Sequence, residues 1–235
     1  PFHDTYWGTT VQRWRDEGLP PEVSPDAYFG CEISRIGGDY TLQFPVHIKE
    51  ETERFRIYND SNGATRKDLK TADGWTPGWL DFRIKGRDDW NRFKARAVYN
   101  RSRIAVRRDA SSPRSETRKE PDGLLEYYRR ERAKGRFITY SAHGCFHPTW
   151  QKIGMENLLI LMCEDPDFIE DMFATHTKLI IDIYEGIKGL GVEYDGAWIS
   201  DDLGYRNAPL ISPAMYRDLV MPHHKQLCDH FAADG

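Results

Sequence analysis

Short apolar runs alternate along the chain with longer segments in which apolar residues recur every three or four positions. A short run bounded by Gly, Pro or Asp is typical of a buried strand, and the longer period is typical of an amphipathic helix. Four runs fit buried strands of a parallel sheet: 2–7, 28–33, 136–142 and 193–199. Helical periodicity covers 9–18, 88–98, 124–134, 154–163 and 166–188. The alternation of strands and helices predicts an α/β fold.

Residues 37–70 interrupt this alternation. Short strand-like runs follow one another there, and Asn59 to Gly63 reads as a turn between two of them. Antiparallel strands can be joined by such tight turns, whereas parallel strands need a long crossover. The segment therefore predicts an antiparallel insertion. Residues 75–84 are expected as loop, as is the polar and basic stretch 101–121.

Two adjacent carboxylates stand where the last predicted strand ends. The apolar run Gly196 to Ile199 leads into Asp201 and Asp202, and a helix is expected to begin at Ser212, a favourable N-cap before Pro213. Functional groups of α/β folds gather at the carboxyl ends of the strands. We therefore expect Asp201 or Asp202 to face a pocket and to act as an acid or base. The alternative is that both satisfy loop N–H groups or cap a turn.

Imidazole and thiol groups follow the third predicted strand. His143 and His147 flank Cys145, and these are ligand types that zinc prefers. Their spacing is not a common structural-zinc pattern, so lining of a pocket by the two histidines is the favoured interpretation, with His143 also a candidate catalytic group. The remaining candidates for substrate binding lie at or after a predicted strand end: His3, Asp4, Tyr6, Trp7, Glu32, Trp150, Glu156, Tyr205 and Arg206.

Structural roles stay open for several of these side chains. His3 could be a hydrogen-bonded core histidine, and Glu32 could pair with Arg35 outside any pocket. Glu156 could simply favour the dipole at the start of a helix. Arg206 could bind a substrate carboxylate or face solvent.

Composition narrows the classes of function. The chain has 235 residues with a net charge of −4, and its Arg-rich stretch lacks the interleaved aromatic residues expected for single-stranded nucleic acid. No apolar run is long enough for a transmembrane helix, and no signal peptide opens the chain. Four widely spaced cysteines without a CxxC motif suggest reduced thiols in the cytoplasm. We expect a small-molecule substrate and neither nucleic acid nor membrane as partner.

Three motifs in the last forty residues carry a resemblance to a known family. WISDDLG at 198–204, LISP at 210–213 with Tyr216, and PHHK at 222–225 resemble the uroporphyrinogen decarboxylase-like superfamily. The resemblance covers most of the chain and implies a (β/α)₈ TIM barrel as one domain over 1–235, with the antiparallel insertion at 37–70. Compared with longer members, about the N-terminal half of the barrel is expected here, truncated at both ends. A doubly wound open sheet is the runner-up, but no Gly-rich phosphate motif supports it.

The superfamily includes haem-pathway decarboxylases and corrinoid-dependent methyltransferases that serve coenzyme M. The decarboxylases grip propionate groups with arginines on the first strand, whereas FHDTYWG at 2–8 has none. The resemblance therefore favours a methyltransferase-like or uncharacterised catabolic branch, with a corrinoid protein as partner and zinc bound by residues beyond Gly235. Uroporphyrinogen decarboxylation, and a non-catalytic barrel that binds a corrinoid or another small ligand, remain as alternatives.

Two structural expectations follow from a half barrel. An unpaired sheet edge and an uncovered apolar face would favour a homodimer. The barrel also predicts that His3, Glu32, His143 and Asp201 or Asp202 converge on one mouth.

Overall fold

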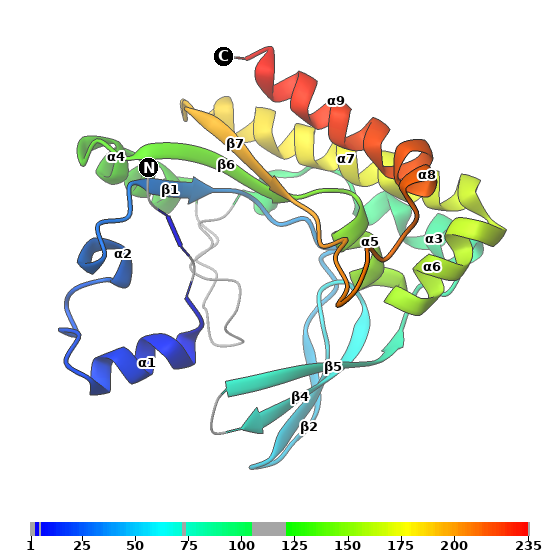
Figure 1. The fold of residues 1–235 in the computed structure, drawn as a ribbon, viewed down its shortest axis with the longest axis horizontal. Helices are drawn as coiled ribbons and strands as arrows, with labels where there is room; N and C mark the ends of the chain where they lie inside the picture. Colours follow the sequence, from blue (N-terminus) through cyan, green and yellow to red (C-terminus); the bar gives the residue numbers. More distant parts are fainter. Residues whose placement is uncertain (1–2, 5, 72–73, 105–120, 235) are drawn as a thin grey trace.

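The computed structural model describes residues 3–4, 6–71, 74–104 and 121–234. It is a mixed α/β structure with two separate sheets (Figure 1). A parallel sheet has the strand order β1 (Ile33–Ile36), β6 (Phe137–His143), β7 (Gly196–Ser200). An antiparallel sheet has the order β2 (His47–Glu51), β3 (Phe55–Asn59), β4 (Ala64–Thr71), β5 (Gly74–Phe82).

Parallel pairing in the first sheet confirms the prediction for the third and fourth strand runs. Ile33 pairs with Phe137, and Thr139 pairs with Gly196. His143 then lies opposite Ser200, so the carboxyl ends of β6 and β7 meet at one edge. That edge positions the candidate site described below.

The strands predicted at 2–7 and 28–33 are wrong. Residues 3–4 and 6–7 lie in no strand, and the other two residues of the first run, Phe2 and Thr5, fall outside the described residues. Ser24 caps a short helix, α2 (Pro25–Tyr28), by accepting a hydrogen bond from the backbone N–H of Ala27. This local cap takes Tyr28 out of the strand, so β1 begins only at Ile33.

One face of the parallel sheet packs against helices and forms the core. Ile138, Tyr140 and Ala142 of β6 are buried with side chains of α7 (Pro166–Lys188). The Tyr140 hydroxyl donates to the carbonyl of Ile180 at 2.7 Å and accepts from the Tyr40 hydroxyl at 2.8 Å. The buried phenol thus has both partners that its burial requires.

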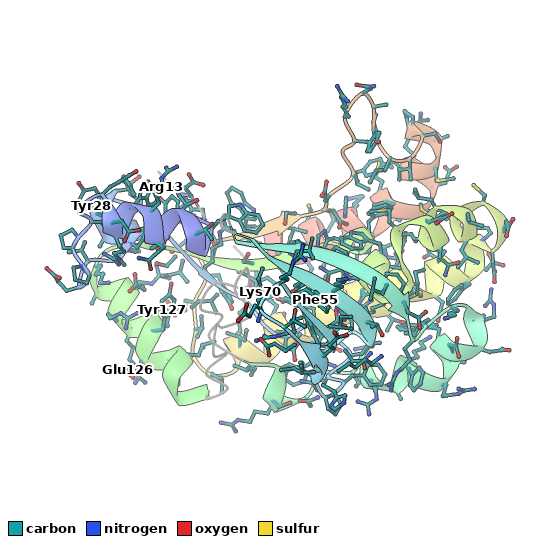
Figure 2. All side chains as sticks on the ribbon, turned by 90° about the horizontal axis from the view of Figure 1, so that it is seen from below. Arg13, Tyr28, Phe55, Lys70, Glu126 and Tyr127 are labelled. Atoms are coloured by element: carbon teal, nitrogen blue, oxygen red, sulfur yellow. The ribbon has the colours of Figure 1, made fainter. Side chains whose placement is uncertain are left out.

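The antiparallel sheet forms an arm that extends away from the parallel sheet (Figure 1). The insertion predicted at 37–70 is present over its later part, but the arm reaches Phe82 because residues 74–82 are strand β5 and not loop. Pro77 lies in this edge strand, where a missing N–H costs no ladder bond. Figure 2 shows Phe55 and Lys70 on the arm, apart from Arg13 and Tyr28 of the N-terminal helices.

Most predicted helices are present with shifted ends. The helix predicted at 166–188 has those bounds, and Ser212 is an N-cap whose hydroxyl accepts from Met215 N at 3.1 Å. The segment Phe146–Ile153 was not predicted as a helix. The remaining helical segments are α1 (Gly8–Asp16), α3 (Arg87–Phe93), two 3₁₀ turns (Lys94–Arg96 and Arg101–Arg103), α4 (Pro121–Ala133), α5 (Phe146–Ile153), α6 (Met155–Glu164), α8 (Pro213–Met215), a π-helical turn (Tyr216–Val220) and α9 (Met221–Ala232).

The described residues do not form a closed barrel. Strand β7 is an edge of the parallel sheet, and Trp198 on it is 44% exposed. Most of the loop predicted at 101–121 lies outside the described residues. Among the helices that the structure describes, none is both long and apolar enough to cross a membrane.

Candidate functional site

Asp201 lies just beyond β7 and binds the start of α5. Its Oδ2 accepts from the backbone N–H of Phe146 at 2.9 Å, and its Oδ1 accepts from that of His147 at 2.6 Å. Cys145, the residue at the N-cap position, makes no capping hydrogen bond with its own side chain. A carboxylate from another strand therefore satisfies the free N–H groups of this helix and benefits from its dipole.

The same carboxylate holds His224 of α9. The His224 Nε2 lies 2.9 Å from Asp201 Oδ2, and its Nδ1 lies 3.2 Å from the Tyr216 hydroxyl. The Asp201 side chain is 2% exposed, whereas that of His224 is 21% exposed. The imidazole is thus fixed at both nitrogens but still reachable from solvent, an arrangement suited to proton transfer.

A buried thiol completes this cluster. Cys145 Sγ, an Asp201 carboxylate oxygen and a His224 ring nitrogen lie within 4.8 Å of one another. Burial of Cys145, and then the negative charge of Asp201, raise the pKa of the thiol. Gly144 permits the close approach, because a Cβ there would lie 2.4 Å from Asp201 Oδ2 and 2.8 Å from His224 Nε2.

His143 and His147 lie beside the cluster and contact each other. Their rings stack with centroids 4.2 Å apart, and His143 Nδ1 lies 3.2 Å from Ser200 Oγ. His147 Nε2 lies 3.0 Å from Gln151 Nε2. Burial, with the neighbouring His143 as a second cause, lowers the pKa of His147 to about 4. His147 is therefore a neutral ring near pH 7, while His143 is exposed at the edge.

Trp150 links these histidines to an apolar hollow. Its ring meets that of His147 at 5.0 Å and that of Trp79, on the arm, at 5.1 Å. A hollow of about 450 Å³ lies between β5 and helices α5 and α6, with Phe82 and Met155 in its wall. Glu156 lines the rim in the first turn of α6. The structure thus brings Trp150 and Glu156 to one surface, although Glu156 also occupies the helix position that favours an acid.

The candidates near the N-terminus do not reach this edge. Glu32 precedes β1, and its carbonyl accepts from Phe137 N at 2.8 Å, so it lies at the amino end of the sheet. Its predicted position at a strand's carboxyl end is wrong because β1 starts one residue later. The other N-terminal candidates lie outside any strand, so the predicted strand-end position is wrong for all of them: His3, Asp4, Tyr6 and Trp7.

Two of these N-terminal side chains have defined contacts elsewhere. The Tyr6 hydroxyl lies 3.5 Å from Cys31 Sγ, and its ring packs on Trp14 at 5.0 Å. His3 meets the ring of Trp198 at 6.0 Å. Burial, and then the charge of Arg35, lower the pKa of His3. Of the four predicted strand-end groups, His143 and Asp201 lie at one edge of the sheet, whereas Glu32 lies at its amino end and His3 lies beside Trp198.

The loop after Asp201 is largely exposed, and its side chains do not belong to the buried cluster. Asp202 and Arg206 are exposed, and Tyr205 is 73% exposed. The loop closes on itself, since Tyr205 N donates to the carbonyl of Ala208 at 3.0 Å and Gly204 forms a bridge with Pro209. Of the two adjacent carboxylates, only Asp201 belongs to the buried cluster.

The sheet face opposite the helices carries polar residues beside the exposed rings of Phe137 and Trp198, and one of them is an arginine that sequence reasoning passed over. Arg35 of β1 lies over the ring of Trp198 at 4.9 Å, and its Nε is buried with no hydrogen-bond partner among the described residues. The register places Arg35 beside Thr139 and Trp198 beside Ser141, all on one face. Strand alternation could have indicated this face once β1 was placed correctly.

His224, Tyr216 and Cys145 are the cluster members that the site prediction omitted. His224 stands 23 residues after Asp201 and on a helix, so no local spacing joins them. The local signal for this contact is the PHHK motif, which contains His224.

No protein-family model, curated protein or solved structure matches the chain.

Proposed function

We propose that this chain belongs to an enzyme of the uroporphyrinogen decarboxylase-like superfamily that transfers a group on a small molecule with acid/base help from Asp201 and His224. The observation that carries the proposal is the 2.9 Å contact between Asp201 Oδ2 and His224 Nε2 at the carboxyl edge of parallel strands. Functional groups collect at this edge in α/β folds.

The architecture supports this superfamily without requiring it. Three parallel strands with helical crossovers are compatible with part of a (β/α)₈ barrel. The ISP motif begins a capped helix at Ser212, and the PHHK motif brings His224 to Asp201. Fold alone does not fix chemistry, so the reaction rests on the cluster.

Within the superfamily we favour methyl transfer from a corrinoid protein to a thiol. The acceptor thiol would give its proton to His224, and Asp201 would stabilise the imidazolium that forms. The thiolate sulfur would then bond to the methyl carbon while the electron pair of the cobalt–carbon bond stays on the corrinoid. The four cysteines are free thiols, which supports a reducing, cytoplasmic setting.

Decarboxylation of a carboxylate-rich substrate is the second candidate. Arg35 favours it, because its guanidinium lies over the Trp198 ring on the sheet face opposite the helices, with a buried Nε that lacks a hydrogen-bond partner among the described residues. An arginine there could hold a substrate carboxylate with paired hydrogen bonds. Replacement of Arg35 by Lys should therefore weaken decarboxylation but leave methyl transfer nearly unchanged.

The test compares carboxylate variants in the full chain. Methyl-cob(III)alamin and a thiol acceptor are supplied, and loss of the cobalt–carbon bond is followed by absorbance; carbon dioxide release from uroporphyrinogen is measured in parallel. D201N and H224Q should lower the active reaction by about 100-fold or more. D202N is the matched control, since Asp202 is exposed. Normal turnover in both D201N and H224Q would refute the assignment, and tight corrinoid binding without turnover would favour the non-catalytic alternative.

A further inference from the structure

Three different metal-ligand types meet at the carboxyl edge of the sheet. Cys145 precedes α5, Asp201 follows β7, and His224 lies on α9; their donor atoms lie within 4.8 Å of one another. We propose that Cys145, Asp201 and His224 bind one divalent transition-metal ion of the zinc class. The inference rests on the proposed function only in that both use the same site. Metal binding can be measured without any substrate, so the two can be tested separately.

The donor set suits such an ion. Thiolate, imidazole and carboxylate are the three protein ligands of zinc, and catalytic sites use three of them with a fourth position open. Ligand atoms about 2.0–2.3 Å from a tetrahedral ion lie roughly 3.2–3.8 Å apart. The present 2.9 Å between Asp201 Oδ2 and His224 Nε2 would need to open by a few tenths of an ångström, and the widest donor pair, which lies within 4.8 Å, would need to close by up to about 1 Å.

Neighbouring groups already orient two of the ligands. The Tyr216 hydroxyl contacts His224 Nδ1 at 3.2 Å, which leaves Nε2 directed at the cluster. The backbone N–H groups of Phe146 and His147 hold both oxygens of Asp201, at 2.9 and 2.6 Å. Outer hydrogen bonds of this kind fix ligand orientation in metal sites.

The exposed fractions of the three side chains indicate that a bound ion would be open to solvent on the His224 side. Cys145 is fully buried and the Asp201 side chain is 2% exposed, while the His224 side chain is 21% exposed. An ion would therefore enter past the imidazole and keep its fourth position on that side. With an ion bound, His224 Nε2 would be a ligand and would not act as a base, so Lewis acidity of the ion would replace proton transfer to His224 in activating a thiol or water placed there.

Helix capping alone does not account for the cluster. Capping of α5 explains Asp201, but it needs neither the Cys145 thiol nor the His224 ring at the same point. The obvious sequence candidates for additional ligands, His143 and His147, are instead stacked on each other with centroids 4.2 Å apart. The inferred ligand set therefore joins three segments and differs from the HGCFH run.

Cobalt binding tests the inference directly. The full chain is treated with chelator, dialysed and titrated with Co²⁺, whose thiolate-to-metal charge-transfer band reports a Co–S bond. We expect one equivalent to bind with this band present. C145A should abolish the band, and both C145A and H224Q should weaken binding by on the order of 100-fold or more. C163A is the matched control, because Cys163 is an exposed free thiol.

Melting curves separate ligand loss from unfolding. If C145A melts cooperatively near the parent temperature, its loss of the band is assigned to the missing ligand; H224Q gives a second, chemically different ligand change if C145A is unstable. Added Zn²⁺ should raise the melting temperature of the parent chain but not of these variants. A band that persists in C145A, or Co²⁺ binding equal in parent and H224Q, would overturn the inference. Stoichiometric Co–S binding without turnover on any substrate would refute the proposed function and leave the metal site standing.

Discussion

The two ends of the parallel sheet each hold a buried carboxylate, but the partners differ. At the amino end, Glu131 has a side chain 7% exposed and contacts Arg130, Lys134 and Arg136 at 2.8–3.1 Å. At the carboxyl end, the Asp201 side chain is 2% exposed, and its side-chain partner is the titratable His224.

The difference separates a structural carboxylate from a reactive one. Fixed cations that cannot give up their protons near neutral pH lock Glu131 into one charge state. A carboxylate held by backbone N–H groups and one imidazole keeps a partner that can gain or lose a proton or accept a metal. Burial alone does not mark a functional acid; the identity of its partners does.

The largest effect should come from G144A, which adds one methyl group at the carboxyl end of the parallel sheet. The Cβ of G144A would lie 2.4 Å from Asp201 Oδ2 and 2.8 Å from His224 Nε2. Because the cluster must move apart, turnover and Co²⁺ affinity should each fall by about 100-fold or more, with a stability loss of about 1–3 kcal/mol. G204A is the control, since nothing lies within 4 Å of its Cβ. Unchanged Co²⁺ binding in G144A would remove the geometric basis of the site.

A buried lysine contrasts with Glu131, because no carboxylate among the described residues lies at hydrogen-bond distance from its amine. Lys152 is fully buried and donates to the carbonyl oxygens of Pro148 at 3.0 Å and Tyr40 at 3.4 Å. Burial, and then the charge of Arg103, lower the pKa of Lys152 to about 7. The unfolded chain therefore binds a proton more readily, and stability should rise with pH between about 7 and 10.

K152M removes this dependence. As pH rises from about 7 to 10, the unfolding free energy of the parent should increase by on the order of 3 kcal/mol relative to that of K152M, as measured by urea unfolding. Asp39 and Asp60 oppose the shift by favouring the charged amine. K178M, at an exposed lysine, is the control. Parallel pH profiles for parent and K152M would contradict a neutral buried amine.

Loss of the Glu131 charge, at the amino end of the parallel sheet, should lower the stability of the chain and not its activity. Burial alone would raise the pKa of Glu131, but hydrogen bonds from Lys134, Arg130 and Ser34 outweigh it and lower the pKa. Its stabilising contribution is thus complete above the ordinary carboxyl pKa and is lost as pH falls through the lowered value. E131Q should destabilise the chain by about 2 kcal/mol at neutral pH and less in acid.

The matched control for E131Q lies on the same helix. Glu126 is exposed on α4 (Figure 2), so E126Q should leave urea unfolding nearly unchanged at both pH values. Equal stability of E131Q and E126Q near pH 7 would show that the cations around Glu131 contribute nothing measurable.

The smallest effect is expected from the outer partner of His224. Y216F removes the hydroxyl 3.2 Å from Nδ1 while keeping the ring. Co²⁺ affinity should fall by about 10-fold, with the melting temperature nearly unchanged. A loss of melting temperature with unchanged affinity would mean that Tyr216 packs but does not position the imidazole.

Elements with strong local signals were predictable. The long amphipathic pattern of α7, the apolar run of β7 and the Ser-Pro start at Ser212 each gave the correct element. In contrast, YFGCEI at 28–33 has strand character, but the Ser24 cap and the packing of Phe29 on Trp14 at 4.9 Å hold its first part outside the sheet. Tertiary packing overrode β-propensity there.

Two misses contain a proline. Pro77 lies in the segment 75–84 that was expected as loop, yet it occupies an edge strand. Pro148 lies in the segment 146–153, for which no helix was predicted, yet it stands in the first turn of α5, where proline is tolerated. Asp201 was predictable from its strand end. Its pairing with His224 was not, because only the folded crossover brings α9 back to β7.

Helix α5 is capped by Asp201, a residue much later in the chain, and this affects the order of folding. The N–H groups of Phe146 and His147 find their acceptor 54–55 residues further along the chain. During synthesis, α5 emerges before Asp201 exists, so its first turn has to wait for β7 to dock beside β6. These two amides should then exchange with deuterium only when β7 detaches, which makes them reporters of a single cooperative unit that spans helix and strand.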